Sequence, residues 1–207
     1  RSSMEILIPI LTAAVRSGTP ILYATLGEIV TEKGGILNLG LEGIMLLGAY
    51  AGFAVSYSTG NAWLGIAAAF FVGTLLGLVH AFICVTLKGN QVVSGLAMTM
   101  FGTGASSLLG RNFVGFTIPG LNKIPVPLLS DIPVIGPVLF NHDALIYCSY
   151  ALVFFLCWFF TSTRQGLYLR ATGDNPRAAD AMGISVAKTR YFYTMVGAGI
   201  VAVGGAY

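Results

Sequence analysis

Long, uninterrupted apolar runs restrict most strongly what this chain can fold into. Four are clear, at residues 36–58, 62–87, 91–110 and 144–162, and a fifth begins near Tyr191 and is still apolar at Tyr207. A helix needs roughly 20 residues to cross the ~30 Å hydrocarbon layer of a bilayer. The runs are continuously apolar and lack the period of two that a lipid-facing barrel requires. We therefore predict an all-α, polytopic transmembrane helix bundle.

The charge content supports a membrane protein and excludes other classes. Only 9% of the residues are charged and 56% are hydrophobic, whereas soluble domains contain about 25% charged residues. So few charges cannot cover a soluble surface, so the apolar surface must face lipid or partner subunits. The net charge of +3 is small and no basic patch is interleaved with aromatic residues, so nucleic acid is not an expected partner. We expect the three cysteines to be buried structural thiols and predict no metal site.

Small residues recur at helical spacing within the apolar runs. The rows are Gly65, Ala69, Gly73, Gly77 and Ala81; Gly102, Ser106 and Gly110; and Gly48 with Gly52. Small residues four apart let helix backbones approach closely in a membrane. We predict tight helix–helix packing along these rows.

Basic residues predict the orientation of the chain. Five lie in residues 163–190, whereas residues 111–143 carry only Arg111 and Lys123. Because cytoplasmic loops are enriched in Lys and Arg, segment 163–190 is predicted to be cytoplasmic and segment 111–143 to be extracytoplasmic. The five prolines of segment 111–143 predict an ordered, mostly non-helical surface loop.

The first part of the chain has two interpretations. Residues 6–27 are long enough to span, but Arg16 and Pro20 interrupt them. One version is a full span. The other is a short interfacial helix to Val15, a half-helix from Pro20, a break at residues 32–35 and a second helix, an arrangement that occurs where it lines a cavity or is buried in protein. Glu28 and Glu32 would share a helix face, and we interpret them as solvated near the cytoplasmic boundary.

Two stretches then resemble one known family. Residues 27–49, with Asn38, Gly40, Glu42 and Gly43 in the order Asn-x-Gly-x-Glu-Gly, resemble a signature of permeases of the branched-chain amino acid, ribose and nucleoside ABC importers. The pattern is most similar to the nucleoside and simple-sugar branch. The resemblance implies a single permease domain over residues 4–207. Residues 1–3, which precede Met4, are set aside because they resemble a tag remnant. Such permeases have further helices, so the chain is expected to be incomplete at its C-terminal end.

The second stretch, residues 170–184, resembles the cytoplasmic loop that such permeases present to their ATPase. Its chemistry predicts a short helix independently. Asn175 is a good N-cap, Pro176 suits the first helical position, and Gly183 is placed to end the helix. By resemblance this is a coupling helix, with these candidate residues: Gly173, Asp174, Asn175, Pro176, Ala178, Ala179 and Gly183.

The resemblance implies an importer subunit without its own enzymatic activity. No Gly-x-x-x-x-Gly-Lys-Ser/Thr loop is present, so ATP and Mg are expected on a separate ATP-binding subunit, with no cofactor in this chain. The other implied partners are a second permease, identical or related, an extracytoplasmic substrate-binding protein and membrane lipid. Nucleosides or simple sugars are the expected cargo. The alternatives are an ion-coupled secondary transporter of a small polar solute, using an acid such as Glu42, and a membrane enzyme using Glu42 or His80.

Asn38 and Glu42 are the candidate residues for the substrate pathway, together with Gly40 and Gly43. Residues four apart share a face if they lie on one helix, and an amide and a carboxylate there would bind hydroxyl groups or base edges of a solute. A buried polar clamp that holds a broken helix is an equally supported role. We interpret His80 as hydrogen-bonded to a neighbouring helix and His142 as a solvated residue.

Overall fold

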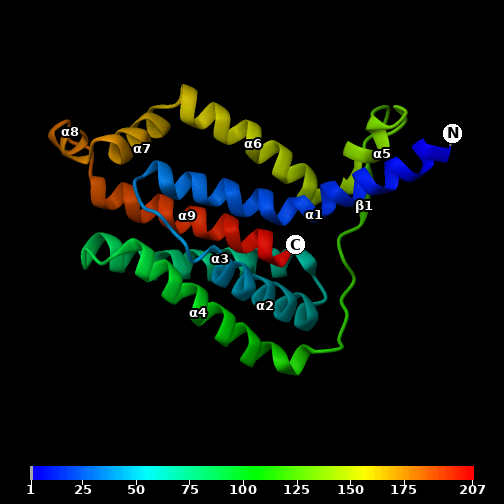
Figure 1. The fold of residues 1–207 in the computed structure, drawn as a ribbon, viewed down its shortest axis with the longest axis horizontal. Helices are drawn as coiled ribbons and strands as arrows, with labels where there is room; N and C mark the ends of the chain where they lie inside the picture. Colours follow the sequence, from blue (N-terminus) through cyan, green and yellow to red (C-terminus); the bar gives the residue numbers. More distant parts are fainter. Residues whose placement is uncertain (1) are drawn as a thin grey trace.

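The computed structural model describes residues 2–207 as a helix bundle with one two-stranded sheet (Figure 1). The helices are α1 (Ser2–Lys33), α2 (Leu41–Thr59), α3 (Ala62–Ala81), α4 (Gln91–Gly110), α5 (Ile135–Leu139), α6 (Ala144–Ser162), α7 (Arg164–Asp174), α8 (Pro176–Ala181) and α9 (Val186–Ala206). A π-helical segment, Phe82–Thr86, extends α3, and a 3-10 turn, Arg111–Phe113, follows α4. Strands β1 (Lys123–Pro125) and β2 (Asn141–Asp143) pair antiparallel, with Lys123 opposite Asp143. The predicted all-α bundle is confirmed.

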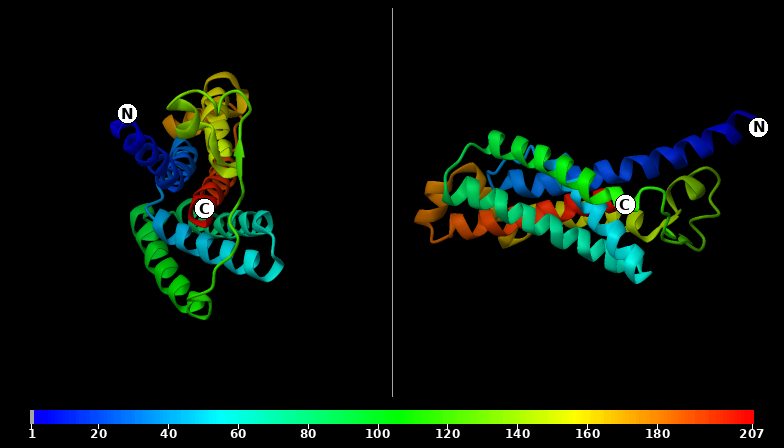
Figure 2. Two further views of the ribbon diagram at one scale, coloured as in Figure 1. Left: turned by 90° about the vertical axis from the view of Figure 1, so that its right-hand side faces the viewer. Right: turned by 90° about the horizontal axis from the view of Figure 1, so that it is seen from below.

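Four segments of the described chain are long and apolar enough to cross a membrane: Ile6–Lys33, Ala62–Thr86, Gln91–Phe113 and Ala144–Ser162. The last three match predicted runs. The other two predicted runs correspond to α2, which begins at Leu41 and not at residue 36, and to α9, which begins at Val186, before Tyr191. Both lie alongside the apolar helices within the bundle (Figures 1 and 2).

Residues 6–27 belong to one continuous helix, so the version with a half-helix starting at Pro20 is wrong. Helix α1 runs through Arg16, Pro9 and Pro20 and ends at Lys33. The break comes between α1 and α2, at residues 34–40, where Gly35 adopts φ +81°. A positive φ suits glycine because it has no Cβ, so this position permits the sharp turn that ends α1.

Helix α9 forms the centre of the bundle and contacts α1, α2 and α3. All five members of the row from Gly65 to Ala81 are buried. A Cβ added at Gly77 would lie 2.7 Å from Ala198 Cβ and 2.8 Å from the Thr194 carbonyl oxygen of α9. The tight packing predicted for this row is confirmed. In the row of α4, close packing is found at Gly102, which contacts Gly43 of α2, but not at Gly110, which faces open space.

The two polar segments lie at opposite ends of the bundle. Figure 1 shows α7 and α8 at one end, and β1 and α5 at the other, beside the N-terminus. Segment 111–143 is mostly non-helical, as predicted, although it contains α5. Segment 163–190 also contains α7, which was not predicted. Thr163 caps it by accepting a hydrogen bond from the Gly166 N–H at 3.0 Å.

We expect a cysteine at Ser185 to be labelled only from the cytoplasmic side and a cysteine at Asn122 only from outside. Both positions are exposed and lie in the two opposite end segments. The measurement is labelling by a membrane-impermeant maleimide in cells and in inverted vesicles. Cys148 and Cys157 are exposed on α6, contrary to the expectation that all three thiols are buried, so they must be replaced in the background. Labelling with the reverse sidedness would overturn the orientation.

Candidate functional site

Asn38 lies in the break between α1 and α2 and fixes its shape. Its side chain is buried, and Oδ1 accepts a hydrogen bond from the Gly40 N–H at 2.9 Å. Its own backbone N–H donates to Glu28 Oε1, also at 2.9 Å. Because α2 begins only at Leu41, the expectation that Asn38 shares a helix face with Glu42 is wrong. The observed contacts are those of a polar clamp.

Glu28 is half-buried, so its interpretation as a solvated residue is wrong. Besides accepting from Asn38, it has a second carboxylate oxygen, Oε2, that is buried without a hydrogen-bond partner among the described residues. An unpaired buried polar atom is costly. Glu28 therefore holds the break at an energetic cost, whereas Glu32 is exposed on the same helix.

His80 links the break to α3 and α4, which confirms its interpretation as a hydrogen-bonded structural residue. Its ring is fully buried; Nε2 donates to the Leu37 carbonyl oxygen at 3.0 Å, which leaves Nδ1 to accept from Ser94 Oγ at 2.9 Å. Gln91 adds a second link, because its Oε1 accepts from the Leu37 N–H at 2.8 Å. Gln91 and Ser94 were not predicted as site residues, because no local sequence pattern indicates their contacts.

Glu42 is exposed in the first turn of α2 and lies deep along the bundle. The adjacent Gly43 packs on α4 at Thr99, whose Cα would be 2.8 Å from an added Cβ. Thr99 lies eight residues beyond the start of α4, which at 1.5 Å per residue is ~12 Å into a layer of ~30 Å. An exposed carboxylate at that depth needs water or a polar partner, so Glu42 is a candidate functional residue.

Gly40 and Gly43 are buried in the contact between α2 and α4. A Cβ at Gly40 would lie 2.7 Å from Met98 Cβ. They allow close helix approach next to Glu42. Because both glycines are buried, neither can contact a solute directly. Their predicted part in the substrate pathway is to support Glu42, which is exposed.

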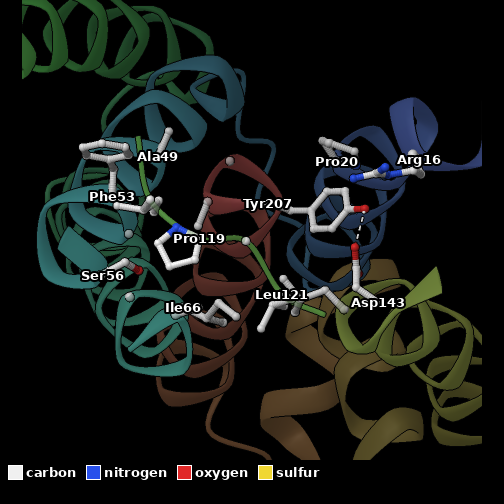
Figure 3. Close-up of a pocket in the computed structure, with 18 of the residues that line it drawn as sticks. Arg16, Pro20, Ala49, Phe53, Ser56, Ile66, Pro119, Leu121, Asp143 and Tyr207 are labelled. Carbon is white, nitrogen blue, oxygen red and sulfur yellow. Dashed lines mark hydrogen bonds between the residues drawn. The ribbon is translucent and has the colours of Figure 1, made fainter. Parts of the chain in front are cut away.

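One face of α2 leads from Glu42 towards the end of the bundle that carries β1. At 100° per residue, Leu46, Ala49 and Phe53 follow Glu42 on this face. Ala49 and Phe53 line a partly open cavity of about 620 Å³ whose wall comes from α1, α2, α3, α9 and residues 118–121 (Figure 3). Its wall also carries Arg16 and Asp143.

At the opposite end, α8 has the predicted capping geometry. Asn175 Oδ1 accepts from the Ala178 N–H at 3.0 Å, and Pro176 occupies the first turn. At the other terminus Gly183 has φ +82°, the Ile184 N–H donates to the Ala179 carbonyl at 3.0 Å, and the Gly183 N–H donates to that of Asp180 at 2.9 Å. This is the Schellman arrangement, in which glycine ends a helix at low cost.

Ala178 and Ala179 of α8 face in different directions. Ala179 is only 3% exposed and faces its own chain, contrary to the expectation that it contributes to an outer docking surface. Ala178 is exposed, and Met182 just beyond the helix is 82% exposed. Any partner that docks here would therefore meet Ala178 and Met182.

The segment around α8 also touches the break directly. Gly173, at the end of α7, packs against the Lys33–Gly35 backbone, where an added Cβ would lie 3.2 Å from the Gly35 nitrogen. From α9, Arg190 Nε donates to the Gly34 carbonyl oxygen at 3.0 Å. Gly173 therefore connects α7 to the break that carries Asn38, and Arg190 connects α9 to it. The contribution of Arg190 could not be predicted from local sequence, since its partner is 156 residues away.

Comparison with known proteins adds independent information. The profile of a family described as the permease component of branched-chain amino acid transport systems matches residues 10–207. A candidate glucose ABC transporter permease of Haloferax volcanii is 39% identical over 96% of this chain and 61% of its own length. A guanosine ABC transporter permease of Bacillus subtilis is 32% identical, over 98% and 67%, and a nucleoside ABC transporter permease of Lactococcus lactis is 34% identical, over 91% and 63%.

The chain thus spans about three fifths to two thirds of the length of these relatives. No solved structure is significantly similar to it.

Proposed function

The chain belongs to the permease family of branched-chain amino acid transport systems, and from this premise we propose that it is the membrane subunit of an ABC importer that moves nucleosides or simple sugars inward. The names of the relatives support this cargo. The observation that carries the proposal is the contact of Gly173 and Arg190 with the break, because it connects the surface at α8 with the element that leads to Glu42.

In this mechanism the partner subunits supply the energy and the cargo. An ATP-binding subunit, which holds ATP and Mg, docks at α8 against Ala178 and Met182. A second permease covers part of the apolar surface, lipid covers the rest, and a loaded substrate-binding protein docks on segment 111–143. ATP-driven movement of α8 then reaches the break through Gly173 and Arg190 and changes access to the face of α2 that carries Glu42.

The rival is an ion-coupled transporter, for which Glu42 would be the coupling acid. The two are distinguished in proteoliposomes containing the full-length permease with its neighbouring subunits. Uptake of radiolabelled guanosine or glucose should require ATP inside, in the compartment that the ATPase faces, and should survive an ionophore that collapses the ion gradients. Uptake without ATP that the ionophore abolishes would contradict the proposal.

Replacing Glu42 with glutamine is expected to lower uptake at least about tenfold or to change which solute is preferred. Glutamine keeps the size of the side chain and removes the charge that would bind solute hydroxyl groups or orient water in the pathway. The assay is initial uptake rate at matched membrane expression. The control is Glu32→Gln, which removes an exposed carboxylate from the end of α1 and should transport normally. Normal uptake by a well-expressed Glu42→Gln variant would count against the pathway, and loss of assembly would indicate a structural role.

A further inference from the structure

The cavity of about 620 Å³ at the end of the bundle opposite α8 has the properties of a ligand site (Figure 3). Pockets that bind small molecules measure about 300–1,000 Å³ and combine apolar walls with a few placed polar groups. Here the apolar wall comes from Phe53, Ile66 and Leu121. The polar groups come from different elements and converge on one space: Arg16 and Ser17 of α1, Ser56 of α2, Asp143 before α6 and Tyr207 after α9.

Asp143 is buried in the cavity wall and held in place by hydrogen bonds. It is only 6% exposed, and both of its carboxylate oxygens are engaged: Oδ1 accepts from the Ile146 N–H at 3.3 Å and Oδ2 accepts from the Tyr207 hydroxyl at 3.0 Å. These bonds fix the carboxylate and the phenol relative to each other. The Arg16 side chain lies beside the Tyr207 hydroxyl oxygen, so Arg16, Tyr207 and Asp143 form one polar group in the cavity wall (Figure 3).

Arg16 brings N–H donors to the cavity beyond the one that faces Tyr207. It is exposed and lines the cavity, and it is a charged residue within a helix that is apolar enough to span a membrane. A charge in such a helix is costly unless it faces water or a polar partner, so its presence points to a solvated functional space. The guanidinium carries five N–H donors and no acceptor.

The balance of charges selects the kind of ligand. Arg16 is positive and Asp143 is negative, and they are the two charged residues among those lining the cavity. The site therefore has no net charge to attract an anion, yet it offers donors from Arg16, Ser17 and Ser56 beside apolar surface. An uncharged solute with several hydroxyl groups and one apolar face satisfies both kinds of wall.

We propose that this cavity binds an uncharged, hydroxyl-rich solute, a nucleoside or a hexose, before it passes along α2 to Glu42, with Arg16 and Ser56 as hydrogen-bonding residues and residues 118–121 as the outer wall. This site deepens the importer function proposed above and rests on it for the identity of the solute. Phe53 lies on the same face of α2 as Glu42 and also lines the cavity, so the α2 face connects the two positions.

The test uses the complete transporter in lipid nanodiscs, with the native cysteines replaced and one cysteine introduced at Ser17. Guanosine, glucose and ribose are the probes, and the readout is the rate of modification by a small maleimide. At least one probe is expected to slow labelling about fivefold or more. The matched control is Ser58→Cys. Ser58 is exposed near the end of α2 that lines the cavity but does not itself line it, so its labelling rate should not change.

A second variant tests the role of the guanidinium. Arg16→Gln is expected to raise about tenfold the solute concentration that is needed to protect the cysteine introduced at position 17. Arg111→Gln, at the same end of the bundle but outside the cavity, should leave that concentration unchanged. Glucose 6-phosphate should protect less well than glucose, and stronger protection by the phosphate ester would overturn the neutral-solute assignment.

The outcomes separate this site from the importer function. No protection by any of the three neutral probes overturns the site, even if ATP-driven uptake is measured. Protection without ATP-dependent uptake supports the site and contradicts the importer.

Discussion

Replacing Gly77 with leucine is expected to leave almost no correctly assembled permease in the membrane. Gly77 lies where α3 crosses α9, and an added Cβ would be 2.7 Å from Ala198 Cβ, 2.8 Å from the Thr194 carbonyl oxygen and 3.0 Å from Met195 Cα. Two of these neighbours are backbone atoms, which cannot rotate away. Overpacking costs about 1–3 kcal/mol even where side chains can adjust, and here the central helix itself must move.

The measurement is the yield of monodisperse protein after extraction in mild detergent, together with its melting temperature. Gly104→Leu is the matched control, because Gly104 of α4 has no neighbouring atom within 4 Å of an added Cβ. It carries the same change in size and helix propensity, and it should express like the unmodified chain. A Gly77→Leu variant with unchanged yield and melting temperature would mean that α3 and α9 do not pack as described.

The helices could be predicted because their signals are local. The apolar runs predicted the bounds of α3, α4 and α6 closely, and the capping residues Asn175 and Gly183 predicted the ends of α8. The spacing of small residues also gave the buried face of α3. Each of these signals depends on neighbours within a few positions of the sequence, which propensity and periodicity describe well.

The candidate site could be predicted only in part, because long-range contacts decide it. Glu28 and Glu32 have the same local spacing, yet only Glu28 is held by the Asn38 N–H. Asn38 is an exception, because its bond with the Gly40 N–H is local and of the kind that Asn makes in turns, and the assignment of Asn38 to a helix overlooked it. The burial of His142, which was expected to be solvated, follows from the long-range pairing of β2 with β1 together with a local bond of Nε2 with the Val138 carbonyl oxygen at 2.7 Å.

The direction in which α8 faces was also beyond the sequence, and it changes how the coupling role must be tested. A short run of alanines has no amphipathic pattern, so it does not show which member packs inward. Because Ala179 is buried in its own chain, a large residue there would distort α8 with or without a partner. The informative position is Ala178, which is exposed on the same two turns.

We expect Ala178→Trp to release the ATPase subunit or to separate ATP hydrolysis from uptake, without changing membrane insertion. A helix fixed at both ends by Asn175 and Gly183 cannot reshape to accommodate an indole that enters a groove of the partner. Loss of at least about 1.4 kcal/mol at this contact corresponds to a tenfold loss of assembly, which copurification of the tagged permease with its ATPase measures directly. Ala151→Trp, on the exposed face of α6, is the matched control and should copurify normally. Unchanged copurification and unchanged uptake in Ala178→Trp would contradict α8 as the coupling element, because an exposed residue on a docking helix cannot gain an indole without altering the contact.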